Sequence, residues 1–305
     1  MNRFATAFLV LLIGIPVNGQ AQGSAAAGQK AVLVTGASTG IGRRITERLA
    51  TAGYFVYAGA RKDADLQALA AIRNVQAVRL DVTKPADIDA VVAAVGKGGR
   101  GLYALVNNAG VVTVGPLVET TPEEFDLVMG VNVYGPYRMT RAFAPLILAQ
   151  RGRIINIGSI SGILSDAGAG AYQMSKHAME TFTDTLAQEL APAGVQVAIV
   201  EPGSYKSDIF KNEAQRSGTG AQYVDHWTRL TEPDDVAAAV ESALSEPKVK
   251  RRYMVVPNEQ QARVTIEAQI EQLVQLNEGQ RYTYDRDTLI KMLDGALATA
   301  RPRSK

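Results

Sequence analysis

The chain has 305 residues, of which 47% are hydrophobic and 20% charged, a balance that allows one large domain with a buried core. Its 32 Lys and Arg residues against 30 Asp and Glu residues leave a net charge of +2, which gives no electrostatic basis for nucleic-acid binding. It has no cysteine and two histidines, so disulfides and thiolate chemistry are excluded and no metal site is expected.

An apolar segment near the N-terminus predicts a signal peptide or membrane anchor over residues 1–21. Arg3 precedes the apolar run Phe4–Ile15, and Gly19 and Ala21 have the small-residue spacing of a cleavage site. The run is shorter than the roughly 20 residues that a membrane-spanning helix needs. We therefore expect export to the periplasm or membrane anchoring, with residues 22–29 as a linker. The alternative is a start codon placed too far upstream, which implies a cytoplasmic protein.

Apolar runs alternate with helical stretches from Lys30 onward, which predicts an α/β domain with a doubly wound parallel sheet and helices on both faces. The runs are continuously apolar, as expected for strands buried on both faces. The predicted strands are 31–34, 55–58, 77–80, 104–106, 154–157, 195–200 and 253–256. The predicted helices, with apolar residues at spacings of three and four, are 43–51, 85–95, 122–131, 139–149, 175–190 and 233–244.

The last third of the chain is less regular. Residues 203–229 are polar and contain Gly218 and Gly220, which predicts a long functional loop such as a lid. Thr231 is the predicted N-cap of the helix over 233–244. Two further predicted helices, 258–276 and 286–297, form a C-terminal extension over 258–305 that covers the core or a subunit contact.

A glycine-rich turn follows the first predicted strand and leads into a helix. Glycine lets the backbone turn tightly and approach a pyrophosphate, and the helix N-terminus offers free N–H groups to that anion. The position between a strand and a helix favours a dinucleotide site over a turn without ligand. The turn comprises Thr35, Gly36, Ala37, Ser38, Thr39, Gly40, Ile41 and Gly42.

The second and third predicted strands indicate which cofactor binds. No acidic residue ends the second strand, where one would bind the adenosine ribose hydroxyls and favour NAD. Arg61 stands there instead and can pair with a 2′-phosphate, which favours NADP; a solvated surface arginine is the alternative. Asp81 ends the third strand, where its carboxylate can accept a hydrogen bond from the adenine amino group.

Tyr172 and Lys176 are four residues apart at the start of a predicted helix, so they share one face of it. A lysine ammonium stabilises a nearby phenolate and lowers its pKa, which makes tyrosine a workable acid–base group. Ser159 follows the strand 154–157, at the sheet edge where ligands bind, and can donate to a developing alkoxide. Each feature alone is common as a surface pair or a loop residue.

Together these residues resemble the short-chain dehydrogenase/reductase family, and the resemblance covers residues 30–257. The pieces occur in the family's order and spacing, and their combination is specific although each alone is not. They are residues 35–42, Asp81-Val82, Asn107-Asn108-Ala109-Gly110, Asn132, Ser159, Tyr172 to Lys176, and Pro202-Gly203.

The resemblance implies a single Rossmann-type domain and a role for each matching residue. Tyr172 would be the acid–base group, and Lys176 would bind the nicotinamide ribose and depress the tyrosine pKa. Ser159 would hold the substrate oxygen, and Asn132 a water that links Lys176 to solvent. Asn107 would brace the sheet. The further cofactor contacts implied are Val82, Asn108, Pro202, Gly203, Tyr205 and Ser207.

Some positions depart from the commonest family pattern. Thr39 stands where NADP-preferring members often carry a basic residue, so the NADP prediction depends mainly on Arg61. The stretch 205–207 is not the commonest sequence after Pro-Gly, and 57–61 and 200–203 resemble members acting on retinoids and steroids. Most members are intracellular, and a periplasm holds little NADP, which conflicts with the predicted leader.

We therefore expect an NAD(P)-dependent oxidoreductase that interconverts a small-molecule alcohol and a ketone or aldehyde. We expect a lipophilic substrate, with residues 204–229 largely setting the specificity. Phe210, Tyr223 and Trp227 would either line an apolar pocket or anchor that loop to the core. The resemblance also implies a homodimer or homotetramer through helices 139–149 and 175–190. Two alternatives stay open: a cofactor-binding sensor or scaffold without turnover, and an epimerase or dehydratase of the same fold.

Overall fold

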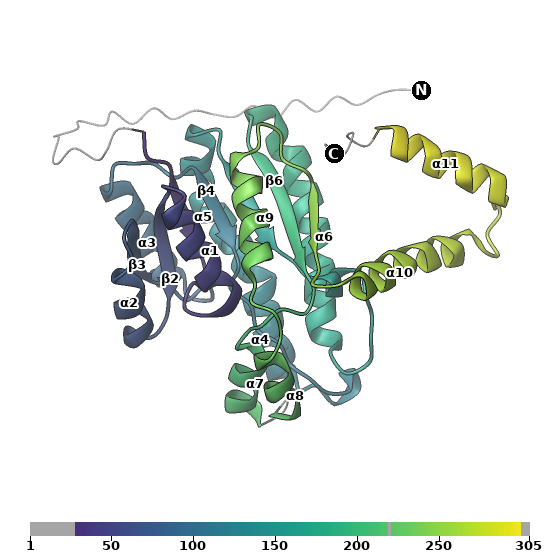
Figure 1. Ribbon diagram of the computed structural model, residues 1–305, viewed down its shortest axis with the longest axis horizontal. Coiled ribbons are helices and arrows are strands. Elements are labelled where there is room, and N and C mark those ends of the chain that lie inside the picture. The colour runs from purple at the N-terminus through teal and green to yellow at the C-terminus, as the bar shows by residue number, and fades with distance from the viewer. Residues whose placement is uncertain (1–27, 219–220, 300–305) are drawn as a thin grey trace.

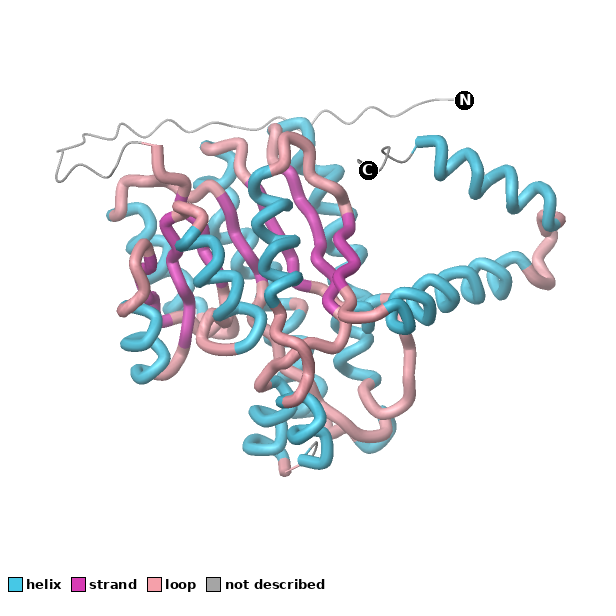
Figure 2. Tube along the Cα trace, viewed as in Figure 1, coloured by secondary structure: helices cyan, strands magenta, loops and turns pink. Residues whose placement is uncertain are grey.

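The computed structural model describes residues 28–218 and 221–299 and confirms the α/β architecture. In these residues seven parallel strands form one sheet in the order β3-β2-β1-β4-β5-β6-β7, with helices on both faces and a helical C-terminal region (Figures 1 and 2). The strands are β1 (Ala31–Val34), β2 (Phe55–Ala60), β3 (Val75–Arg79), β4 (Ala104–Asn107), β5 (Arg153–Ile157), β6 (Gln196–Pro202) and β7 (Arg252–Val255).

The helices follow the strands in alternation along most of the chain. They are α1 (Gly40–Thr51), α2 (Asp63–Ala70), α3 (Pro85–Lys97), α4 (Pro122–Asn132), α5 (Tyr134–Ala149), α6 (Gly170–Leu190), α7 (Ile209–Ser217), α8 (Ala221–Thr228), α9 (Asp234–Ser245), α10 (Glu259–Asn277) and α11 (Arg286–Thr299). The predicted leader over residues 1–21, and the linker up to residue 27, lie outside the described residues. Among the residues described, no helix is long and apolar enough to cross a membrane.

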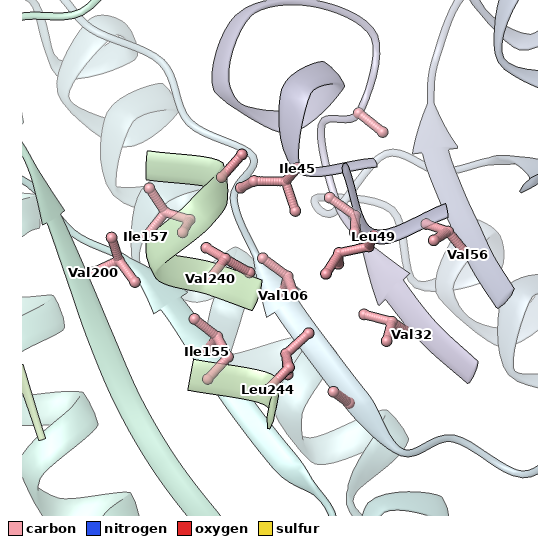
Figure 3. Packing of buried hydrophobic residues seen from close by; sticks show 14 of the residues in the cluster. Val32, Ile45, Leu49, Val56, Val106, Ile155, Ile157, Val200, Val240 and Leu244 are labelled. Carbon is pink, nitrogen blue, oxygen red and sulfur yellow. The ribbon is translucent and has the colours of Figure 1, made fainter. Parts of the chain in front are cut away.

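Two apolar clusters, one on each face of the sheet, form the core. On one face, Ile45 of α1 and Val240 of α9 pack against strand residues such as Val106 and Ile155 (Figure 3). On the other face, Phe143 of α5 belongs to a cluster that also includes residues of α3 and α6. Each buried Val, Leu or Ile contributes about 1.5–3 kcal/mol, so this two-sided burial explains why the strands are continuous apolar runs.

The structure differs from the sequence prediction first at helix α2 and at the start of α9. Helix α2 was not predicted, because its only buried residue is Leu69 and it lacks an apolar stripe. The predicted cap Thr231 is wrong: α9 begins after Pro233, and the carbonyl of Thr231 accepts instead from the backbone N–H of Lys206 at 2.9 Å.

The segment 203–229, expected to be irregular, contains helices α7 and α8. Its aromatic side chains drive the packing of these helices on each other. The ring centroid of Phe210 lies 4.7 Å from that of Trp227 and 5.5 Å from that of Tyr223. Contacts among these rings stabilise two short helices, which the polar composition of the segment does not reveal.

The C-terminal extension leaves the body of the protein, as Figure 1 shows for α10 and α11. Thr265 is the buried residue of α10, and no residue of α11 that the structure describes is buried. Apolar side chains on both helices stay exposed, including Ile270 (54%) and Leu293 (58%). Beyond the first turns of α10, the extension therefore does not cover the core.

Candidate active site

A cavity of about 500 Å³ opens at the carboxyl ends of the strands. It spans the position where the strand order reverses between β1 and β4, which is where open α/β sheets bind ligands. Most of the predicted site residues line it. They are Gly36, Ser38, Thr39, Ile41, Gly42, Arg61, Asp81, Val82, Asn108, Ser159, Tyr172, Lys176, Pro202, Gly203, Tyr205 and Ser207.

Glycine is required in the turn after β1 because other parts of the protein approach its backbone. Gly36 has a φ of +65°, and a Cβ there would lie 2.8 Å from the Cα of Ala109. A Cβ on Gly42 would lie 2.2 Å from the carbonyl oxygen of Gly36. Ala37 and Gly40 do not line the cavity: the N–H of Ala37 donates to Gly59, and Gly40 faces Ser207. These two residues shape the turn.

Thr35 and Asn108 hold this turn against the end of β4. The Thr35 hydroxyl accepts from the backbone N–H groups of Asn108 and Ala109, each at 3.0 Å. The Asn108 amide donates to the carbonyls of Thr35 at 2.8 Å and Gly36 at 3.0 Å. The predicted cofactor contact Asn108 thus also fixes the shape of the glycine-rich turn.

The N-terminus of α1 is free to receive an anion. Its N-cap Thr39 makes no side-chain hydrogen bond to the first turn, and no acidic residue lies in that turn. The free N–H groups and the positive end of the helix dipole therefore remain without a side-chain partner. Thr39 and Ile41 both line the cavity, so the residues present fit the pyrophosphate of a dinucleotide.

Asp81 and Arg61 line the part of the cavity at the ends of β2 and β3. Burial acts to raise the pKa of Asp81, but hydrogen bonds from the backbone and hydroxyl of Thr83, together with the Arg61 charge, lower it below its usual range. Arg61 is exposed and also lines an adjoining polar cavity of about 180 Å³ with Lys62 and Lys211. Asp65 and Asp208 line the same small cavity.

Tyr172 and Ser159 meet on the cavity wall. Burial raises the pKa of Tyr172 to about 12, and the neighbouring Ser159 hydroxyl lowers it only in part. The Ser159 hydroxyl also accepts from the Ser161 N–H at 3.1 Å and donates to the carbonyl of Pro202 at 3.4 Å. In this arrangement Tyr172 keeps its proton at neutral pH.

Lys176 lies behind Tyr172, with its ammonium 5.5 Å from the centre of the tyrosine ring. Its Nζ donates to the carbonyl of Ile157 at 2.9 Å. Burial lowers the pKa of Lys176 to about 8, with the Glu180 carboxylate acting against that shift. The expected depression of the Tyr172 pKa by Lys176 is therefore not found in this geometry, because burial penalises both charged forms.

Asn132 does not line the cavity. Its side-chain oxygen accepts from the N–H of Val111 at 2.9 Å, and its amide donates to the carbonyl of Val111 and to the Ser175 hydroxyl, each at 2.9 Å. These bonds tie the end of α4 to the start of α6. The contacts that the structure gives Asn132 are structural, and its role toward a water stays a prediction.

Of the three aromatic residues predicted either to line a pocket or to anchor the loop, Phe210 and Trp227 line the cavity, whereas Tyr223 does not. Sequence reasoning missed another part of the wall, which comes from loops, from α7 and from α10, and no local motif marks it. The missed residues include Val112, Leu164, Asp166, Asp208, Ile209, Asn212, Gln261 and Val264.

Glu180 and Glu201 form a largely buried carboxyl pair near Lys176. Glu201 of β6 is 2% exposed, and its carboxylate faces Glu180 of α6 and Arg252 of β7. The Arg252 Nε lies 3.1 Å from Glu180 and 3.4 Å from Glu201. Burial and the neighbouring carboxylate raise the pKa of Glu201 to about 8, so near neutral pH the pair holds a proton.

Glu201→Gln should stabilise the protein at alkaline pH. The unfolded chain loses this proton near pH 4–5 and the folded protein only near pH 8, so the pair lowers stability as the pH rises between these values. We expect the free energy of unfolding of the variant, relative to wild type, to rise by about 2 kcal/mol from pH 5 to pH 9. Urea unfolding at both pH values measures it.

The exposed Glu259→Gln is the matched control, because Glu259 is 90% exposed and pairs only loosely with Arg263. Its effect should be the same at both pH values. A Glu201→Gln effect that does not change with pH would contradict a shared proton in the pair.

The fold and this cavity define a Rossmann-type protein with a cavity of about 500 Å³ at the carboxyl edge of its sheet. The chain belongs to the short chain dehydrogenase family, which matches residues 30–218. It is thus an oxidoreductase of that family.

The chain is similar to the mouse protein retinol dehydrogenase 5, with 36% identity over 231 residues, 73% of this chain and 70% of that protein. It is 34% identical to rat mitochondrial D-beta-hydroxybutyrate dehydrogenase over 60% of this chain, and this match spans 56% of the rat protein. These similarities place the chain near the retinol dehydrogenase-like members.

Two solved structures share the fold and contain a cofactor. A metagenomic short-chain oxidoreductase in complex with NADP matches with a TM-score of 0.63 and 31% identity, over 75% of this chain and 97% of that one. A short chain dehydrogenase/reductase from Burkholderia phymatum in complex with NAD matches with a TM-score of 0.72 and 26% identity, over 84% and 98%. Both nicotinamide cofactors thus occur among proteins of this fold.

Proposed function

We propose that the protein interconverts an alcohol and a ketone or aldehyde by hydride transfer, with NADP preferred over NAD and a lipophilic small molecule as substrate. The observation that carries the proposal is the placing of Tyr172 and Ser159 together on the wall of the cavity, with Lys176 behind them. Tyr172 acts as the acid–base group, Ser159 and Tyr172 contact the substrate, and Lys176 contacts the cofactor.

The state of Tyr172 suits carbonyl reduction. A phenol with a pKa of about 12 is protonated at neutral pH, and this is the form that donates a proton to the carbonyl oxygen as it becomes an alcohol. The Ser159 hydroxyl stabilises the negative charge that develops on that oxygen. The reduced nicotinamide cofactor, when bound, supplies the hydride. In the opposite direction Tyr172 must first lose its proton, which burial disfavours.

The cofactor would run from the glycine-rich turn to Tyr172. The N-terminus of α1 would hold the pyrophosphate, and Asp81 and Val82 the adenine. Lys176, Pro202, Gly203, Tyr205 and Ser207 would surround the nicotinamide end. This placement of the cofactor is supported by the uncapped first turn of α1 and by Gly36 and Gly42, where a side chain would clash with nearby backbone.

The preference for NADP depends on Arg61. Arg61 belongs to both the main cavity and the small polar cavity beside it, where Lys62 and Lys211 add positive charge. The carboxylates of Asp65 and Asp208 balance part of the charge of these three cations. A 2′-phosphate on the adenosine ribose would meet these cations, and the fork of an arginine guanidinium suits it.

The lipophilic character of the substrate is supported by the apolar wall of the cavity. Leu164, Ile209, Phe210, Trp227 and Val264 contribute the apolar lining, beside polar residues such as Asp166 and Asn212. Apolar lining residues favour ligands with a hydrocarbon part. The similarity to retinol dehydrogenase 5 agrees with this substrate class.

We further propose that the protein forms a homodimer or homotetramer through α5 and α6. Apolar side chains remain exposed on these helices, with Tyr134 at 56%, Tyr137 at 49% and Met174 at 47%. Such exposed apolar side chains on neighbouring helices are typical of protein interfaces. The predicted leader would export or anchor the assembly.

Titration of the protein with NADPH and NADH, followed by cofactor fluorescence, tests the cofactor part of the proposal. Arg61→Ala should weaken NADPH binding by about 10-fold or more and NADH binding by less than about 2-fold, since a charge-assisted bond contributes roughly 1.5–3 kcal/mol. Equal losses for both cofactors would exclude a contact with the 2′-phosphate. Arg73→Ala controls for the change in net charge, because Arg73 is exposed and lies just before β3, at the amino ends of the strands and away from the cavity.

A screen of lipophilic ketones and alcohols with the preferred cofactor tests the reaction. Turnover with any of them supports the oxidoreductase proposal. Binding of neither cofactor would instead favour a scaffold, and binding without turnover a sensor.

A further inference from the structure

Gln261, in the first turn of α10, connects the C-terminal extension to the cavity. Its side-chain oxygen accepts from the backbone N–H of Ser204 at 2.9 Å. Gln261 and Val264 are the α10 residues that line the cavity. The segment that receives this contact, Pro202–Ser204, begins with the last residue of β6 at the carboxyl edge of the sheet.

The same segment makes two further hydrogen bonds, one to Ser159 on the cavity wall and one to the backbone of β7. The carbonyl of Pro202 accepts from the Ser159 hydroxyl at 3.4 Å, and the N–H of Gly203 donates to the carbonyl of Val255 at 2.8 Å. Without Gln261, the Ser204 N–H would have no protein acceptor in this arrangement. The position of the Pro202–Ser204 segment therefore depends on a hydrogen bond to a side chain 57 residues further along the chain.

Gln261 itself is fixed by three features of α10 and its surroundings. Asn258 caps the helix by accepting from the Gln261 N–H at 3.0 Å, and the buried Thr265 hydroxyl donates to the Gln261 carbonyl at 2.7 Å. A Cβ on Gly203 would lie 2.1 Å from the Gln261 side-chain oxygen. Glycine at position 203 thus leaves the space that the glutamine side chain occupies.

We propose that Gln261 is a positioning residue of the active site, which holds the Pro202–Ser204 turn in the form that receives the nicotinamide end of the cofactor. This inference depends on the proposed function for its effect on binding, but the contact between α10 and the turn does not. The first turn of α10 then belongs to the catalytic domain, in contrast to the exposed remainder of the extension.

Gln261→Met, which keeps the length of the side chain and removes the acceptor, should raise the dissociation constant of the preferred cofactor by about 5- to 10-fold, the effect of one lost hydrogen bond. Gln261→Glu keeps an acceptor oxygen and should stay within about 2-fold of wild type. The control is Gln260→Met, the same change at the neighbouring exposed residue, which should have no effect.

Amide hydrogen exchange provides a readout that does not need the cofactor. In Gln261→Met the peptide that contains Ser204 should exchange faster, whereas in Gln261→Glu and Gln260→Met it should exchange at the wild-type rate. Unchanged exchange and unchanged cofactor affinity in Gln261→Met would each overturn the inference. If the wild-type protein bound neither cofactor, the proposed function would fail, and the exchange experiment would still decide whether Gln261 holds the turn.

Discussion

Tyr172→Phe should lower the rate of turnover by at least about 10³-fold, within the range that a positioned general acid contributes. The change removes the phenolic proton and leaves the ring in place. Because Tyr172 is half-buried on the cavity wall beside Ser159, the loss of its hydroxyl should not open the cavity or weaken the fold. The dissociation constant of the cofactor should therefore stay within about 3-fold of wild type, since the ring still fills the same space.

Single-turnover kinetics together with fluorescence titration measure both quantities on one preparation. Tyr137→Phe removes a phenolic hydroxyl from a half-exposed residue of α5 and is the matched control, with no expected change in rate. A Tyr172→Phe enzyme that keeps more than a tenth of the wild-type rate would exclude Tyr172 as the acid–base group. The epimerase or dehydratase alternative would then also lose its main support, because it uses the same residue.

Lys176→Met should lower the rate by about 10²-fold or more and weaken cofactor binding by about 10-fold, because charge-assisted hydrogen bonds are the strong ones. Methionine keeps most of the side-chain volume but cannot donate to Ile157 or carry a charge. Loss of both rate and cofactor binding would distinguish the role of Lys176 from that of Tyr172, because Tyr172→Phe should lower the rate alone.

The pH dependence of cofactor binding gives a second measure of the same residue. Burial lowers the pKa of Lys176 to about 8, so the wild-type ammonium is present below this pH and is lost as the pH rises through it. Wild-type affinity should decline above about pH 8, while the affinity of Lys176→Met should show no such decline. The exposed Lys97→Met, at the end of α3, should behave as wild type. An alkaline decline that persists in Lys176→Met would assign it to another group.

Local sequence signals predicted most of the sheet, and most of the site residues that they singled out line the cavity. The strand runs are apolar throughout because both faces of a parallel sheet are covered, and this pattern can be recognised without a structure. The glycines of the turn after β1 and the Tyr172–Lys176 spacing are likewise local: one depends on backbone geometry and the other on the pitch of a helix. The strand order then brings the ends of six strands to one cavity.

The electrostatics of the site required the tertiary structure. The sequence shows that Lys176 lies one turn from Tyr172, but burial decides the outcome, raising the pKa of the phenol and lowering that of the ammonium. Likewise, the asparagine at position 132 matches the family pattern, but only the structure shows that its side chain bonds to Val111 and Ser175. Desolvation depends on all neighbours at once, and a linear pattern does not contain them.

The sequence by itself determined the class of fold, the turn for the dinucleotide and the identity of the polar groups at the reacting end, because each follows from short-range spacing. Only the tertiary structure decided that 209–217 and 221–228 are helices that pack through an aromatic cluster, and that Gln261 reaches the segment at the end of β6. Contacts of this kind join residues far apart in the chain, and their free energy comes from packing that no local propensity records.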